Sequence, residues 1–244
     1  MSTASYVFAA VLYAAAGVFA AGLVRKIAQY ARVRAPLKIP TTPAPTTHLG
    51  VGLRLVREIV FFESLFKANL WIWLFGWLFH GALLLVLLRH LRYFVEPVWS
   101  WLVWVQPLGV LAALAMVAGL LGLWARRLLV ERIAYISTPS DHLMLALLLL
   151  IAVSGLSLKF FAHTDIVAVK IYFLGLLHLE LQPLPSDPLL YLHLALVSML
   201  LAVFPFSKLL HAPGLLFSPT RNQTDDSRQV RHLAPWAARL ETEH

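Results

Sequence analysis

Four histidines of this 244-residue chain lie inside long apolar segments, where burying an imidazole without a partner is costly. They are His80, His90, His193 and His211. The first two lie in the segment Ala68–Leu91 and the last two in Leu189–Ala212. An ionisable side chain at membrane depth marks a functional site by default. Two histidine pairs on two helices are what two b-type haems with two axial imidazoles each would require.

The composition indicates that the solvent of this chain is a bilayer. Hydrophobic residues make up 60% of it, charged residues 13%, and its mean hydropathy is +0.76. A soluble core of this size cannot bury so much apolar surface, whereas about 20 apolar residues suffice for one membrane-crossing helix. Five segments qualify: Tyr6–Val24, Ala68–Leu91, Trp101–Trp124, His142–Lys159 and Leu189–Ala212. We therefore predict an all-α membrane protein, a bundle of five transmembrane helices.

Basic residues predict the orientation of the bundle. Of the 20 lysines and arginines, all but four fall between helices one and two, between helices three and four, or at the C-terminal end of helix five and beyond it. The four exceptions are Arg89, Arg92, Lys159 and Lys170. The resulting ratio of sixteen to four predicts an outer N-terminus and a cytoplasmic C-terminus in a bacterial or archaeal cytoplasmic membrane. The net charge of +8 then reflects attraction to lipid headgroups, and nothing calls for nucleic acid.

The first segment is as long as a signal peptide, but its basic residues Arg25 and Lys26 follow the apolar run instead of preceding it. We expect a retained helix, although the small residues at 14–16 would permit cleavage. Residues 1–218 should form the five-helix domain, and residues 219–244 a polar cytoplasmic tail that docks on a partner.

Three further segments have recognisable patterns. The proline-rich stretch Arg34–Pro45 predicts a cytoplasmic loop, and Leu49–Phe66 predicts an amphipathic helix at the inner surface that could run directly into helix two. Ile166–Leu181 is too short to span and predicts an outer-surface or re-entrant helix.

The chain has no cysteine, which excludes disulfides, covalent c-type haem and cysteine-ligated iron–sulfur clusters within it.

The predicted orientation makes helices two and five antiparallel, which pairs the histidines by depth. His80 and His211 would form the inner pair, and His90 and His193 the outer pair. Along a straight helix, ten residues span about 15 Å and eighteen residues about 27 Å. Two straight helices would therefore not bring the two histidines of each pair to the same depth in the membrane. We expect Pro205 to kink helix five. At about 100° per residue, His193 and His211 would share one face of that helix.

Two roles besides haem ligation are compatible with the four histidines. They could be polar packing residues or the relays of a proton-coupled transporter, and a third alternative, a haem-free anchor that recruits a soluble enzyme, leaves the four imidazoles unexplained. Basic residues near them could hold haem propionates or reach the lipid headgroups: Arg89, Arg92, Lys67 and Lys208. His163 and His178 could face a quinone, although surface positions are the simpler interpretation.

The spacings of ten and eighteen resemble those of the NarI-like family, the cytochrome b (gamma) subunits of respiratory nitrate reductases. The block Phe204–His211 is similar to that family's phenylalanine–proline–phenylalanine–serine block before its last ligand. Arg126–Leu128 with Ser137–Asp141 is similar to its connection between helices three and four. The resemblance implies five helices, an outer N-terminus and two haems b held by helices two and five. Quinone-site residues cannot be transferred, because the family's quinone-site lysine has no counterpart near Trp101–Gln106.

Within that family, the segments Phe217–Asn222 and Arg231–Trp236 resemble DsrM, the cytochrome b of the sulfite-reductase-associated DsrMKJOP complex. This resemblance implies a cytoplasmic iron–sulfur partner similar to heterodisulfide reductase, with further membrane, iron–sulfur and cytochrome c subunits. We therefore expect a dihaem cytochrome that transfers electrons between the quinone pool, menaquinone or ubiquinone, and that partner in dissimilatory sulfur metabolism. The gamma subunit of another respiratory complex, of nitrate reductase or heterodisulfide reductase type, is the alternative.

Overall fold

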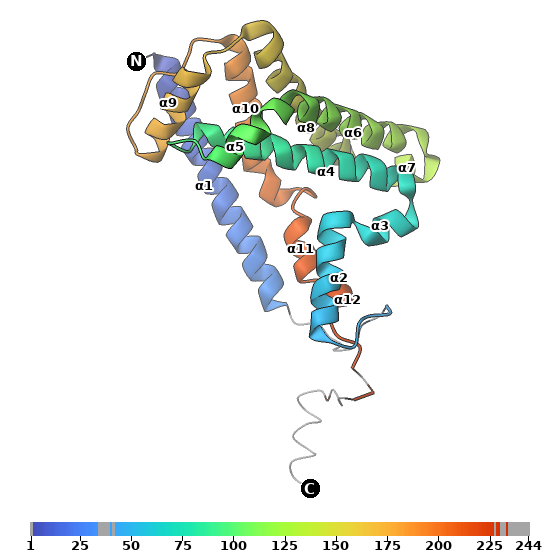
Figure 1. Ribbon diagram of the computed structural model, residues 1–244. Helices are drawn as coiled ribbons and strands as arrows, with labels where there is room; N and C mark the ends of the chain where they lie inside the picture. The colour runs from blue at the N-terminus through green and yellow to red at the C-terminus, as the bar shows by residue number, and fades with distance from the viewer. Residues whose placement is uncertain (1, 34–39, 41, 227, 230–232, 234–244) are drawn as a thin grey trace, which may run out of the picture. The chain divides into compact units, whose positions relative to one another are not determined.

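The computed structural model describes residues 2–33, 40, 42–226, 228, 229 and 233, and this part of the chain is helical without a strand (Figure 1). Among these residues, five helical segments are long and apolar enough to cross a membrane. They are Thr3–Arg32, Leu70–Tyr93, Ser100–Leu129, Pro139–Ala162 and Pro188–Phe206. The predictions of an all-α chain and of five spans are confirmed. The predicted loop Arg34–Pro45 lies largely outside the described residues.

The chain forms two compact units. The first comprises residues 1–22 and 65–208, and the second residues 23–64 and 209–244. The helix α1 (Thr3–Arg32) contributes to both. The helices and turns of the first unit are α4 (Leu70–His90), η1 (Leu91–Tyr93), α5 (Ser100–Val105), η2 (Gln106–Leu108), α6 (Gly109–Leu129), α7 (Glu131–Ile136), α8 (Pro139–Ser157), η3 (Leu158–Ala162), α9 (Ile166–Leu177), α10 (Pro188–Val203) and η4 (Phe204–Phe206). The second unit holds α2 (His48–Phe61), α11 (Ala212–Leu216) and α12 (Pro219–Asn222), and α3 (Glu63–Ala68) bridges the boundary in sequence.

In the first unit, α4 packs on α6, α6 on α8 and α8 on α10, as Figure 1 shows. Glycines permit the closest approach: a Cβ atom on Gly119 of α6 would lie 3.0 Å from the backbone of α4. A core of Phe79, Ala82, Met116, Leu120 and Ala152 fills the α4–α6–α8 contact. Helices in a bilayer associate through such close van der Waals packing at small residues.

Large apolar side chains point outward along the spans. Leu84 and Leu87 of α4 are each 57% exposed, and Leu111 of α6 is 66% exposed. Apolar area left in water costs about 25 cal/mol per Å², so a surface of this kind requires lipid around it.

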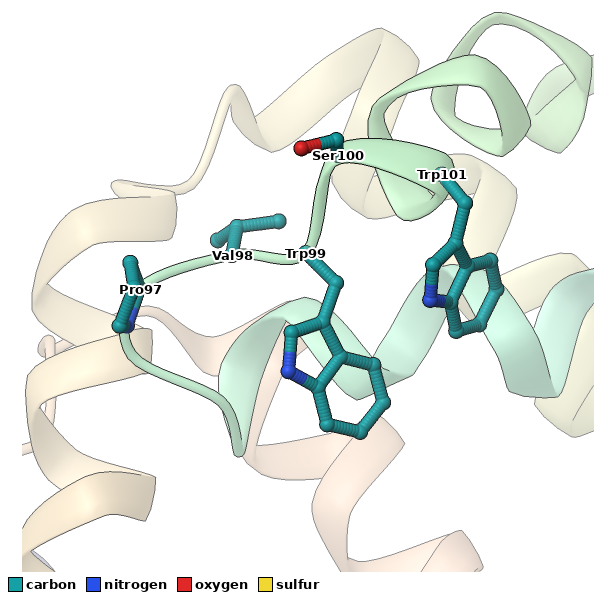
Figure 2. A pocket seen from close by; sticks show the side chains of 5 residues that line it. All are labelled: Pro97, Val98, Trp99, Ser100 and Trp101. Atoms are coloured by element: carbon teal, nitrogen blue, oxygen red, sulfur yellow. The ribbon is translucent and has the colours of Figure 1, made fainter.

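The connection from α4 to α5 forms a shallow hollow of about 560 Å³ (Figure 2). Residues 97–101 line it, and the rings of Trp99 and Trp101 stack at a centroid distance of 5.7 Å. Paired tryptophans of this kind suit the interface between lipid and water. Lys170 of α9 forms an ion pair with Glu96 of this connection.

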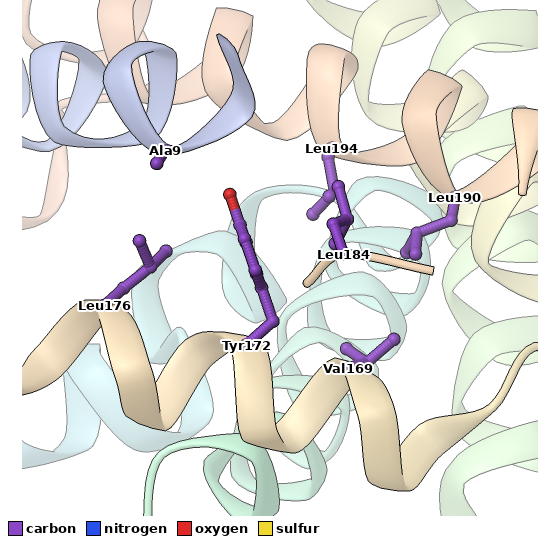
Figure 3. Packing of buried hydrophobic residues seen from close by; sticks show 7 residues of the cluster. All are labelled: Ala9, Val169, Tyr172, Leu176, Leu184, Leu190 and Leu194. Atoms are coloured by element: carbon purple, nitrogen blue, oxygen red, sulfur yellow. The ribbon is translucent and has the colours of Figure 1, made fainter. Parts of the chain in front are cut away.

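The short helix α9 is held by a second core (Figure 3). Tyr172 is fully buried and points from α9 toward α1, where its hydroxyl donates to the carbonyl oxygen of Ser5 at 3.1 Å. Tyr13 of α1 donates in turn to Leu176 O of α9 at 2.6 Å. The predicted short helix is confirmed, and it docks on α1 and α10 within the first unit.

Two predictions of a continuous helix are wrong. The helix α2 does not run into α4, because Phe62 adopts a left-handed conformation (φ 51°) and Asn69 caps a new helix with its side chain. The second break is at Pro205, where α10 ends at Val203 and a 3₁₀ turn follows instead of a kink. Pro205 is fully buried, and a Cβ atom on Gly22 of α1 would lie 2.5 Å from its ring. Packing on α1 thus favours a helix end at this proline.

Candidate functional site

His80 and His90 lie on α4 and share one hydrogen-bonding geometry. The Nδ1 atom of each is 2.7 Å from the carbonyl oxygen four residues earlier, Gly76 O and Val86 O respectively. A carbonyl oxygen only accepts, so Nδ1 must carry the ring proton in both. The Nε2 atom then carries the lone pair, which is the form of imidazole that binds a metal.

His193 of α10 reaches the same tautomer through a different partner. Its Nδ1 atom lies 2.8 Å from Oγ of Ser154 on α8. The single hydroxyl proton of Ser154 is donated to Ile151 O at 3.0 Å, so Oγ accepts from His193 Nδ1–H. Ser154 is buried at 5% exposure, which keeps water from competing for this bond. His193 therefore also presents Nε2 as an electron-pair donor.

Gly155 makes room for the His193 ring. A Cβ atom at this position would lie 3.3 Å from His193 Cε1, closer than nearly all real contacts. The pair Ser154–Gly155 thus supplies both the acceptor and the space for the imidazole. The sequence alone did not single out these two residues, and a serine–glycine step inside an apolar span is only a weak signal.

His90 and His193 both belong to the first unit and interact electrostatically there. These are the two histidines that were expected to form the outer pair. His90 is exposed and is the last residue of α4, while His193 is half-buried within α10.

His211 lies in the second unit, exposed at the N-cap position of α11. Because α10 ends at Val203, the expectation that His193 and His211 share one face of a single helix is wrong. The height difference of about 27 Å inferred from a continuous helix fails for the same reason. The assignment of His211 as a ligand does not depend on that continuity and stays a prediction.

Two arginines place unpaired donors beside His90. The Nε atoms of Arg89 and Arg92 are buried and have no hydrogen-bond partner in the described part of the chain. Arg92 uses its other nitrogens on Gln106 Oε1 at 3.0 Å and on the Tyr93 hydroxyl at 2.7 Å. A buried N–H without an acceptor is costly, so these atoms fit an anionic group such as a haem propionate. The residues around His90 therefore suit a haem.

Lys208 has a carboxylate partner. Its Nζ atom donates to both oxygens of Asp141 at 2.9 Å, which joins the turn after α10 to the first turn of α8. Asp141 also accepts from the backbone and hydroxyl of Thr138, completing a capping box, and Arg127 lies 3.7 Å away. These contacts link the two blocks that carried the family resemblance. They favour a structural role for Lys208 over a propionate contact.

Three further histidines of the first unit, His142, His163 and His178, lie at other positions of the fold. His142 accepts a hydrogen bond from Trp124 Nε1 at 3.1 Å, near the start of α8. His163 and His178 are exposed at the ends of η3 and α9, in agreement with surface positions.

Comparison with known proteins agrees with this architecture. The family model for the nitrate reductase gamma subunit matches residues 64–233. A relative from Archaeoglobus fulgidus is 38% identical over 269 residues, covering 92% of this chain and 81% of that protein. A relative from Archaeoglobus profundus is 33% identical over 286 residues, covering 97% and 84%. Both are named Hdr-like menaquinol oxidoreductase cytochrome b-like subunit. The chain is therefore a multi-pass membrane protein that belongs to the nitrate reductase gamma subunit family.

Proposed function

We propose that this chain is the cytochrome b subunit of a menaquinol oxidoreductase and carries two b-type haems. His80 and His211 would ligate one iron, and His90 and His193 the other. One observation supports this most directly: His80, His90 and His193 each hold the ring proton on Nδ1 against a protein oxygen. Metal-ligating histidines characteristically donate their other N–H in this way.

A bound haem supplies one-electron transfer. The protein's share is to orient the imidazoles and to tune them through the acceptors on Nδ1. Gly76 O and Val86 O do this within α4, and Ser154 does it across the α8–α10 contact. The Nε donors of Arg89 and Arg92 would neutralise propionates, and the apolar spans exclude water from the path.

The absence of cysteine supports an iron–sulfur partner subunit. It has no cysteine, so iron–sulfur chemistry requires another subunit. The word Hdr-like in the relatives' name supports a partner similar to heterodisulfide reductase. We place that partner in the cytoplasm, with an outer N-terminus and residues 219–244 as the docking tail of the 1–218 domain. The bias of basic residues supports this orientation.

The finer assignment to DsrM and to dissimilatory sulfur metabolism is part of this proposal. The complex would then include further membrane, iron–sulfur and cytochrome c subunits. Residues 217–222 support the assignment by resemblance, and residues 231–236, apart from Leu233, lie outside the described part of the chain.

A proton-coupled transporter gains less support from the spans. Asp141 is the only carboxylate within the five of them, and it pairs with Lys208. A proton relay would call for an unpaired acid at membrane depth.

The test is haem content in single His→Ala variants of the purified complex. We expect about two haems per chain by pyridine haemochrome for the native protein, and about one for a change at His80, His90, His193 or His211. His163→Ala is the matched control, because that side chain is exposed and outside the proposed pairs. Two haems in any of the four variants would remove that residue from the ligand set, and a native complex without a Soret band would refute the function itself.

A further inference from the structure

The helix α2 turns a polar face toward its own unit and an apolar face outward. Glu58 is 9% exposed and accepts from Arg221 Nη1 at 2.9 Å, while Val51 on the same side is buried. Four apolar side chains on the opposite side are at least half exposed. They are Leu49 (75%), Leu53 (52%), Val56 (53%) and Val60 (50%). This is the reverse of an ordinary surface helix.

The four side chains form one continuous apolar stripe. Their spacings of four, three and four residues keep them within about 60° of one another at about 100° per residue. Glu58 falls about 180° from Leu49 on the same wheel. The stripe, residues 49, 53, 56 and 60, contains no charged side chain.

Contacts on the polar side hold this orientation. Glu58 also accepts from the hydroxyl and the backbone N–H of Ser64, at 2.6 and 3.2 Å. Arg221 donates a second bond to Ser64 Oγ at 3.1 Å, and α2 packs on α12. Rolling the helix to bury the stripe would break these charge-assisted bonds. The stripe is therefore held away from its own unit.

The chain tethers α2 to the bilayer at both ends. Only eight residues lie between its end at Phe61 and the span that begins at Leu70, a reach of at most about 30 Å. On the other side, the span of α1 ends at Arg32 and α2 begins at His48.

The charge beside the stripe suits lipid headgroups. Arg57, at its edge, is exposed, and none of the ion pairs found among the described residues includes it. Glu58 is the only carboxylate of α2 and is already paired with Arg221. An apolar stripe bordered by unpaired basic charge is typical of helices that lie in an anionic membrane surface.

We infer that α2 lies in the bilayer interface, with Leu49, Leu53, Val56 and Val60 in contact with acyl chains and Arg57 at anionic phosphodiester headgroups. This inference does not rest on haem binding. The helix would fix the second unit to the membrane surface, where a water-soluble partner could reach it.

The absence of cysteine makes the test clean, because each introduced cysteine is the only label site. Spin labels on Leu53→Cys and Val56→Cys of the full chain, in vesicles of phosphatidylcholine and phosphatidylglycerol at 3:1, should relax more with oxygen than with a water-soluble nickel chelate. Leu84→Cys on the lipid-exposed side of α4 provides the membrane reference. His48→Cys, exposed on α2 but about 100° off the stripe, should favour the nickel chelate.

Anionic lipid is tested separately. In vesicles of pure phosphatidylcholine, the spin label at residue 53 should favour oxygen over the nickel chelate less than in the mixed vesicles. In the Arg57→Gln variant, the two kinds of vesicle should give the same result. Nickel accessibility at residues 53 and 56 equal to that at residue 48 would overturn the inference. So would protection of the stripe only after the partner subunit is added, since the stripe would then be a protein docking surface.

Discussion

Removing the Ser154 hydroxyl tests whether the protein tunes an imidazole at His193. In Ser154→Ala, the His193 Nδ1–H loses its acceptor at 2.8 Å, while the space beside Gly155 is unchanged. A neutral hydrogen bond of this kind contributes about 0.5–1.5 kcal/mol. Loss of such a partner typically lowers metal affinity by roughly 10- to 100-fold.

The same bond has a redox consequence. An acceptor on Nδ1 makes imidazole a stronger donor and stabilises oxidised iron. Its loss should raise the midpoint potential of one haem, and about 0.5–1.5 kcal/mol corresponds to roughly 20–60 mV for one electron. A potentiometric titration of the visible bands should show one component shifted upward and the other unchanged.

Ser157→Ala is the matched control for this experiment. Ser157 lies on the same helix, and its hydroxyl donates to Val153 O at 2.9 Å without contacting a histidine. Both potentials should stay at native values. If Ser154→Ala also leaves both potentials and the haem content unchanged, the Nδ1 argument fails for His193.

Three further changes test the packing. Asp141→Ala removes a helix cap and a partly screened ion pair with Lys208, so the protein should lose about 1–3 kcal/mol of stability. The loss should appear as a lower melting temperature in detergent. An unchanged melting temperature would argue against a stabilising contact between Lys208 and the start of α8. Burial raises the pKa of Tyr172 to about 12, so the stability of the native protein should fall as the pH rises from about 10 toward 12. Tyr172→Phe should reduce that dependence of stability on pH. The same dependence in both proteins would contradict a role for Tyr172 in it. Gly119→Val should cost about 1–3 kcal/mol because its Cβ would lie 3.0 Å from the α4 backbone, whereas Gly17→Val, with open space around it, should lack this packing cost; equal losses would point to helix propensity.

The spans were predictable because their signal is local. About 20 apolar residues bounded by charges predict a bilayer helix without knowledge of its neighbours. The end of α10 was not predictable in this way. A proline inside an apolar run can kink or end a helix, and here the outcome depends on the contact of Pro205 with Gly22, which lies far away in the sequence.

The candidate site, too, was predictable only where the signal is local in the sequence. Residue type and depth singled out the four histidines, but their hydrogen-bond partners come from tertiary structure. Ser154 is identified only once α8 packs on α10, and Asp141 is explained only by its contact with Lys208. The face shared by His193 and His211 was wrong because it extrapolated one helix across residue 205.

The bonds of His90 separate a ligand from a packing residue. A histidine that serves only to join helices is expected to hydrogen-bond across them. His90 instead gives its Nδ1 proton to Val86 O of its own helix. This bond joins no helices, and it leaves Nε2 with the lone pair that coordination of a metal requires, as the bond to Ser154 does at His193.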